Sequence, residues 1–244
     1  MLLRQISKTA AAGSAFAALL VMGITIASQP VRADNDNNGA QDEKRMIAIG
    51  HAAAPVPLNM AGKDPDMVGL GSYLVNVTSD CNGCHSAPPT TYFGTGNPYF
   101  LTPPNGPFLG TKVVNPAYYL GGNQDFGTLG PPPSPNIISR NLTPDKIGVA
   151  AGQAEGHNTL AQFLQIMRTG ADLDHAHPNC SATITTNCFP HGTGLPPFNG
   201  DLLQVMPWPV FQSMTDRQLT AIYIYLSAIP CLEGGPGEPA NRCH

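Results

Sequence analysis

The 244-residue sequence contains few charged side chains, since Asp, Glu, Lys and Arg together make up 11% of it. So low a charge argues against a coiled coil, a solvated polyelectrolyte and a nucleic-acid binder with a basic face. Tryptophan occurs once, and past residue 34 no apolar run is long enough to span a membrane. The 42% of hydrophobic residues suffices for a core, while 25 Pro and 26 Gly predict one globular domain that is rich in loops.

Motifs for catalysis by side chains alone are also missing. The sequence shows no nucleotide-binding loop and no recognisable catalytic base or nucleophile. A phosphate-binding loop lies between a strand and the helix that it opens. Gly121 and Gly122 do not lie between two such patterns, so they predict no phosphate-binding loop. Any chemistry is therefore expected to belong to a cofactor.

The N-terminus has the pattern of an export signal. Arg4 and Lys8 precede an uncharged stretch, and Val31, Arg32 and Ala33 form a small-residue cleavage site. We expect residues 1–33 to be a cleaved signal peptide, with an uncleaved anchor as the alternative, and the mature chain to be periplasmic without an integral span. The remaining chain would carry 9 basic and 16 acidic side chains. Residues 34–63 are then expected to be a polar, disordered N-terminal extension.

Cys81, Cys84 and His85 form a Cys-x-x-Cys-His sequence, which is the attachment motif for c-type haem. Two thiols at this spacing lie on one side of a helical turn and can form thioethers with both vinyl groups, and the next histidine can bind the iron. A zinc half-site or a thioredoxin-like pair would need a second ligand pair or a βαβ context, and neither is present. The motif predicts one covalently bound haem c with His85 as an iron ligand.

The order of motifs resembles that of class I c-type cytochromes. The match covers roughly Asp64 to Pro230 and includes, besides the haem motif and a Tyr-rich last helix, the segments Gly71–Leu74, Asn141–Asp145, Met167–Gly170 and Met206–Pro209. It is most similar to the cytochrome domains that accept electrons from periplasmic alcohol and sugar-acid dehydrogenases. Those chains usually carry several haem motifs, whereas this one carries a single motif. The resemblance implies an all-α, cytochrome c-like fold of at least three helices around one haem.

The first of the three helices is predicted to begin at Asp64, a good N-cap residue that Pro65 follows. Its apolar positions recur at helical spacing: Met67, Leu70, Leu74 and Val77. In the resembling family the first and last helices cross with a small residue against an aromatic one. Gly71 and Tyr73 could fill this role against Tyr223.

Two further helices begin with capping boxes. Thr159 opens a middle helix that Gly170 is placed to end, and Thr215 opens a last helix that ends before Pro230. Their apolar stripes are Phe163, Leu164 and Met167 in the middle helix, and Leu219, Ile222, Tyr223 and Leu226 in the last.

Residues 64–230 are thus predicted to form the cytochrome domain. Its segment 88–140, rich in Pro and Gly and without a sustained period, is expected to be a long loop insertion that wraps the haem. Residues 231–244 follow as a C-terminal tail.

The iron needs a sixth ligand or an open site. Met206 lies in a Pro-flanked loop just ahead of the last helix, where the resembling family places its axial methionine. Met214 is the second choice, Met167 is expected in the core, and the other candidates are His157, His175, His177, His191 and His244. Pro88 resembles the proline whose carbonyl holds the ring of the first histidine ligand, and Trp208 is expected to reach a haem propionate.

The other four cysteines allow three disulfide pairings. Cys180 with Cys188, and Cys231 with Cys243, close the shortest loops, and we expect these two disulfides, so that the tail is closed. The alternative is a metal site formed by the neighbouring imidazoles and thiolates, namely His175, His177, Cys180, Cys188 and His191.

The expected function is that of a monohaem electron carrier, not an enzyme in itself, which passes electrons from a dehydrogenase donor to an oxidase or another cytochrome. The alternatives are a peroxidase-like haem enzyme or a ligand-binding haem sensor, both with an open iron site. Nucleic acid is not an expected partner.

Overall fold

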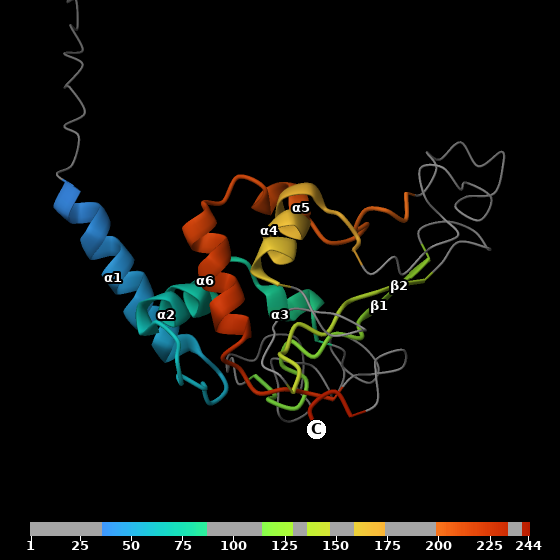
Figure 1. Cartoon of the computed structure of the whole chain (residues 1–244), viewed down its shortest axis with the longest axis horizontal. Helices are drawn as coiled ribbons and strands as arrows, with labels where there is room; N and C mark the ends of the chain where they lie inside the picture. Colours follow the sequence, from blue (N-terminus) through green and yellow to red (C-terminus); the bar gives the residue numbers. More distant parts are fainter. Residues whose placement is uncertain (1–35, 87–113, 129–135, 147–158, 174–198, 234–240) are drawn as a thin grey trace, which may run out of the picture. The chain divides into compact units, whose positions relative to one another are not determined.

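Within the part of the chain that the structure describes, the fold is mostly helical and contains one small two-stranded sheet (Figure 1). The structure is a computed structural model that describes residues 36–86, 114–128, 136–146, 159–173, 199–233 and 241–244. The elements are α1 (Asp36–Ala53), α2 (Pro65–Tyr73), the π-helix η1 (Leu74–Thr78), α3 (Cys81–Cys84), β1 (Asp125–Thr128), β2 (Asn136–Ile138), α4 (Leu160–Thr169), α5 (Trp208–Phe211) and α6 (Asp216–Leu226).

Helix α2 packs against α1 on one side and α6 on the other (Figure 1). Glycines make both contacts close. A Cβ atom on Gly69 would lie 2.7 Å from a side-chain carbon of Ile47 in α1, and one on Gly71 would overlap the carbonyl of Ala221 in α6. Ser72 adds a buried hydrogen bond, donated by Oγ to the carbonyl of Gly50 at 2.6 Å. The three helices therefore meet at distances that only residues without side chains permit.

The predicted aromatic partner of Gly71 was wrong by two positions along the last helix. Tyr225, not Tyr223, packs on Gly71, whose Cβ atom would lie 2.7 Å from that of Tyr225. Tyr223 is half-buried and instead contacts Phe163 of α4, with ring centroids 5.6 Å apart. Two residues apart on a helix, the two tyrosines point in different directions and join α6 to different neighbours.

The predicted starts of the three helices are confirmed, and so is the predicted end of the middle helix at Gly170. Asp64 accepts a hydrogen bond from the backbone of Asp66, and Thr159 and Thr215 each form a complete capping box. Gly170 ends α4 in the left-handed conformation, with φ of 71°. These boundaries were predictable because each depends on side chains within one turn.

Helix α2 continues into the π-turn η1, which the periodic pattern did not predict. The backbone N–H of Ser79 donates to the carbonyl of Leu74 at 3.0 Å, five residues back. The wider turn changes which residues face the core. Val77, expected on the buried stripe, is 47% exposed, while Val75 is fully buried.

The expectation of an all-α fold holds only in part, because β1 and β2 pair antiparallel. Both lie within the expected loop insertion. Strands of four and three residues are too short to show an alternating pattern in the sequence.

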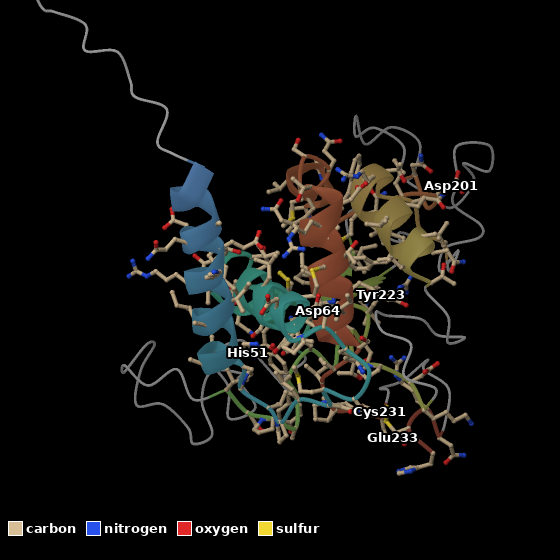
Figure 2. All side chains as sticks on the ribbon, turned by 60° about the vertical axis from the view of Figure 1, so that its left-hand side comes forward. His51, Asp64, Asp201, Tyr223, Cys231 and Glu233 are labelled. Carbon is tan, nitrogen blue, oxygen red and sulfur yellow. A yellow bond between two sulfur atoms is a disulfide. The ribbon has the colours of Figure 1, made fainter. Side chains whose placement is uncertain are left out.

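The C-terminal tail is closed by the predicted disulfide between Cys231 and Cys243 (Figure 2). It docks on the segment that follows β2. The backbone N–H of Leu232 donates to Oγ1 of Thr143 at 3.0 Å, and Nδ2 of Asn141 donates to the carbonyl of Leu232 at 3.1 Å. Cys180 and Cys188 lie outside the described residues.

Helix α1 corrects the expectation of a disordered polar extension. Its residues are mostly polar, so no apolar stripe marks it, and its packing depends on Gly50 and Ile47 against α2. The predicted signal peptide, residues 1–33, lies outside the described part of the chain. No helix among the described residues has the length and apolar composition that a membrane span requires.

Candidate functional site

The haem motif forms one short helical turn. The backbone N–H of Gly83 donates to the carbonyl of Asp80 at 3.0 Å, and that of His85 donates to Cys81 at 2.9 Å. Asp80 enters the turn with φ of 46°, a left-handed conformation that Asp tolerates better than most residues. Cys81 and Cys84 are not joined to each other by a disulfide. The turn therefore brings both free thiols and His85 together, as the sequence predicts.

The ring of His85 is held by a backbone carbonyl. Its Nδ1 donates to the carbonyl of Arg140 at 2.8 Å. A carbonyl only accepts, so this bond requires the proton on Nδ1, and in a neutral ring Nε2 then carries the lone pair. Burial lowers the pKa of His85 and outweighs the hydrogen bond to the Arg140 carbonyl, which raises it, so the neutral form is favoured. A neutral ring with an Nε2 lone pair is the form that binds a metal ion.

The holding carbonyl differs from the one that the sequence suggested. Pro88 was expected to hold the ring, and the structure assigns this contact to Arg140, 55 residues from His85 in sequence. Pro88 itself lies outside the described residues. Because every residue carries a backbone carbonyl, the sequence does not indicate which residue accepts this hydrogen bond. The fold decides it, since the segment after β2 packs against the motif.

Gly122 makes this approach possible. Its backbone N–H donates to the carbonyl of His85 at 2.8 Å, and a Cβ atom at Gly122 would lie 2.6 Å from the carbonyl oxygen of Arg140. Its φ of 71° is also left-handed. Gly122 thus has a structural role that the sequence pattern does not indicate.

Asn82 anchors the turn from its buried side. Its Oδ1 accepts hydrogen bonds from the backbone of Leu120 at 3.0 Å and from the hydroxyl of Ser86. Its Nδ2 is buried and has no hydrogen-bond partner among the described residues. Asn82 lies between the two motif cysteines and was not predicted to have a role.

The surroundings of the motif favour the protonated form of both thiols, although Cys84 is exposed. Burial raises the pKa of Cys81 to about 12, and the nearby carboxylate of Asp80 adds to the shift. Burial and Asp80 also raise the pKa of Cys84. Catalytic Cys-x-x-Cys pairs have a lowered thiol pKa instead. The environment therefore argues against the thioredoxin-like alternative.

Met206 lies in the segment that leads into α5, and Trp208 is the first residue of that helix. Met206 is half-buried and packs against the apolar core. The backbone N–H of Trp208 donates to the carbonyl of Met206 at 2.8 Å, and the indole of Trp208 packs on Gly170, where a Cβ atom would overlap it. Glycine at the end of α4 thus also makes room for the indole of Trp208.

The other candidate ligands divide between core and undescribed segments. Met167 is 5% exposed on α4, which confirms its place in the core, and Met214 is half-buried against the core. His244 is exposed, and its Nε2 lies 3.7 Å from Oε1 of Glu233 in the tail. The alternative metal site of His175, His177, Cys180, Cys188 and His191, together with His157, lies outside the described residues. Within the described residues no group of three or more His, Cys, Asp or Glu side chains could hold a metal ion.

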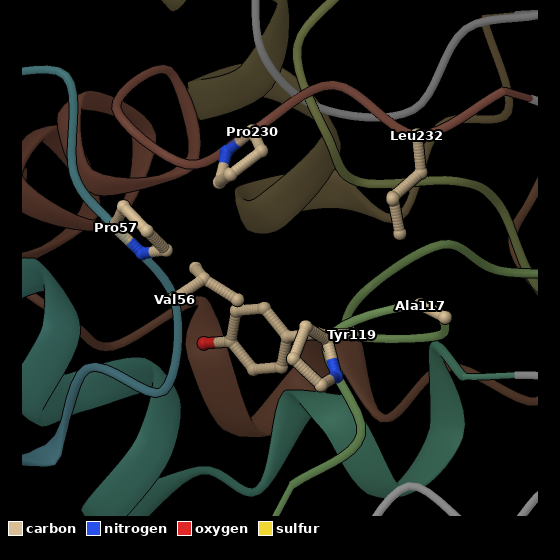
Figure 3. A pocket seen from close by; sticks show the side chains of 7 residues that line it. Val56, Pro57, Ala117, Tyr119, Pro230 and Leu232 are labelled. Atoms are coloured by element: carbon tan, nitrogen blue, oxygen red, sulfur yellow. The ribbon is translucent and has the colours of Figure 1, made fainter.

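An apolar cavity of about 280 Å³ lies beside the loop that contains Tyr119 (Figure 3). Tyr119 contributes one wall, and none of the predicted site residues lines it. The lining consists of Val56, Pro57, Pro116, Ala117, Tyr119, Pro230 and Leu232. This cavity is therefore not the predicted haem site.

No family model matches this chain, and no curated protein matches it either. The functional interpretation therefore depends on the sequence motif and on the geometry above.

Proposed function

We propose that this chain is a periplasmic monohaem c-type cytochrome that carries single electrons between redox partners. The hydrogen bond from Nδ1 of His85 to the carbonyl of Arg140 is the observation that carries the proposal. It orients the ring and leaves Nε2 as the metal-binding nitrogen, next to two free thiols at haem-attachment spacing. A haem c supplies the one-electron chemistry.

The residues of the chain have distinct parts in this proposal. Cys81 and Cys84 would hold the haem covalently, and His85 and Met206 would be the two protein ligands of its iron. A thioether ligand favours ferrous iron and so would raise the reduction potential. With both ligands supplied by the chain, the haem would transfer electrons without binding a substrate. Trp208 is the further residue that we propose to contact the haem.

We propose as redox partners a periplasmic dehydrogenase as the donor and an oxidase or another cytochrome as the acceptor. The excess of acidic over basic side chains in the predicted mature chain favours a neutral or acidic docking surface. On this proposal the chain is an electron-transfer protein or a cytochrome subunit of a dehydrogenase, and not an enzyme by itself.

The absorption spectrum of the purified ferric protein tests the function. We expect haem that stays attached after denaturation, a low-spin spectrum, and the weak far-red band of charge transfer from methionine sulfur to iron. A high-spin spectrum would favour the open-iron alternatives, a peroxidase-like enzyme or a ligand sensor. A chain without covalent haem would contradict the proposal altogether.

Met206→Ala tests the second ligand, with Met214→Ala as its matched control. Both methionines are half-buried and pack against the core, so both variants lose a similar contact. We expect the far-red band to vanish in Met206→Ala and to persist in Met214→Ala. The reverse pattern would assign the ligand to Met214.

A further inference from the structure

Arg140 connects the His85 ring to a second loop. Its carbonyl holds the ring, and its guanidinium donates from Nη2 to Oδ1 of Asp172 at 2.9 Å. Asp172 is 6% exposed, and Arg140 is 26% exposed. A carboxylate buried to this extent is tolerated only when it is paired, so the partner and the geometry of the pair are constrained.

Asp172 follows α4 and contacts the segment that contains Met206. Its backbone N–H donates to the carbonyl of Asp201 at 2.8 Å (Asp201 is labelled in Figure 2). One residue on each side extends this contact, since Ala171 and Leu202 form a β-bridge. The loop after α4 and the segment that begins at residue 199 are thus joined by backbone hydrogen bonds at the position of Asp172.

We propose that the ion pair between Arg140 and Asp172 is a positioning strut, which holds the Met206 segment in place relative to the carbonyl that orients His85. The inference rests on the proposed function, because it assigns His85 and Met206 as the two iron ligands. Neither side chain of the pair binds iron. Both act through the loops that they join.

Electrostatics alone predicts a different result from positioning. Removal of the positive charge of Arg140 would stabilise ferric iron and lower the reduction potential, and removal of the negative charge of Asp172 would raise it. If the pair is a strut, either loss weakens the bond between Met206 and iron. The potential then falls in both variants, because the stabilisation of ferrous iron by sulfur is lost.

The experiment uses the full-length holoprotein and its variants Arg140→Gln, Asp172→Asn and the double variant. All of them keep the backbone carbonyl at position 140. Imidazole competes with methionine for ferric iron, so its apparent affinity reports how often the sulfur is detached. We expect imidazole to bind about tenfold more tightly to each single variant, which is the scale of one lost charged hydrogen bond. The far-red band weakens in both.

The double variant tests whether the two side chains act as one unit. We expect its imidazole affinity to match that of the single variants instead of showing a multiplied effect. Arg140→Lys keeps the charge but not the planar guanidinium, and gives a milder variant with the same direction of change. If the other variants fold poorly, the measurements are made on Arg140→Lys instead.

Arg217→Gln is the matched control, because Arg217 forms an exposed ion pair with Glu43 at 2.7 Å between α6 and α1. It should leave imidazole affinity and potential unchanged. Potential shifts of opposite sign at Arg140 and Asp172, or imidazole affinities equal to that of the wild type, would overturn the inference while the proposed function stands. Loss of folded protein in all four variants at positions 140 and 172 would reduce the pair to a stabilising role and would overturn it too. Failure of the function itself is recognised earlier, as a wild type without covalent haem or without the far-red band.

Discussion

Two regions of the molecule are held together by different forces. The helix crossing, formed by α1, α2 and α6, depends on close backbone approach at Gly50 and Gly71 and on fully buried apolar side chains such as Val68 and Leu219. The loop layer, formed by residues 114–128, 136–146, 231–233 and 241–244, has buried polar groups and a disulfide. Asn141 and Thr143 are both fully buried there, and each is hydrogen-bonded.

The comparison matters for function because the loop layer contains the carbonyl that orients His85. Close packing dominates at the helix crossing, where Ser72 adds one buried hydrogen bond. In the loop layer more of the buried contacts depend on a particular donor and acceptor. The helix crossing should therefore determine whether the chain folds. The loop layer should determine how precisely the predicted haem ligands are placed.

The largest expected effect is at the helix crossing, in Gly71→Ala. The added Cβ atom would overlap the backbone carbonyl of Ala221, which cannot move without shifting α6. We expect a loss of about 3 kcal/mol in the free energy of unfolding. Urea unfolding of the purified protein, followed by the helical circular dichroism signal, measures it.

The control for this change is Gly39→Ala in α1, where a Cβ atom would meet no atom within 4 Å. There the same substitution should stabilise the helix by up to about 1 kcal/mol. Equal unfolding midpoints for the two variants would show that close approach does not hold the helix crossing together.

A middle-sized effect is expected when the disulfide of the loop layer is removed. Cys231→Ala with Cys243→Ala opens a loop of 12-residue separation, which should cost roughly 2–3 kcal/mol. Substitution is preferable to a reductant, which would also act on any disulfide between Cys180 and Cys188.

Hydrogen exchange shows where the disulfide variant loosens. We expect faster exchange at the amides of Leu142 and Lys146, which donate to Leu120 and to Arg242 of the tail. Amides within α2 and α6 should still exchange only through global unfolding, so their protection should fall by no more than the loss in the free energy of unfolding. Uniform loss of protection in both regions would show that the tail supports the whole fold.

The same division explains which features could be predicted from the sequence. Helix starts at Asp64, Thr159 and Thr215 depend on neighbours within four residues, so local patterns identify them. The haem motif is local in the same way. The sequence did not reveal α1, whose polar residues form no apolar stripe, or the outward rotation of Val77 by the π-turn.

The contacts of the candidate site are mostly non-local, and this is why they were missed. Arg140 lies 55 residues from His85 and 32 from Asp172, and it acts on His85 through a carbonyl that any residue carries. Gly122 permits this contact through the absence of a side chain. Among these contacts, the ion pair of Arg140 and Asp172 depends on the side-chain types. The sequence still did not identify it, because each of the two residues could pair with several others of opposite charge.

The smallest expected effect is at the junction of the two regions, in Tyr119→Phe. The Tyr119 hydroxyl donates to Oδ1 of Asn76 at 2.5 Å and lies 2.7 Å from the hydroxyl of Tyr225 in α6. Tyr225 keeps its hydrogen bond from Nδ2 of Asn76, so we expect a loss of only about 1 kcal/mol. Tyr118→Phe, at the neighbouring half-buried tyrosine, should change the stability by less than about 0.5 kcal/mol.

The pH dependence of stability gives this last variant a second signature. Burial raises the pKa of Tyr119 well above its ordinary value, with a further increase from Tyr225, so the folded phenol stays protonated where the unfolded one ionises. The unfolded state therefore binds fewer protons above about pH 10, and stability is lost as the pH rises. Urea unfolding at pH 8 and pH 10.5 should show a smaller decrease in Tyr119→Phe than in the wild type. An unchanged decrease would mean that the phenol of Tyr119 ionises as readily in the folded chain, and hence that the junction is open to water.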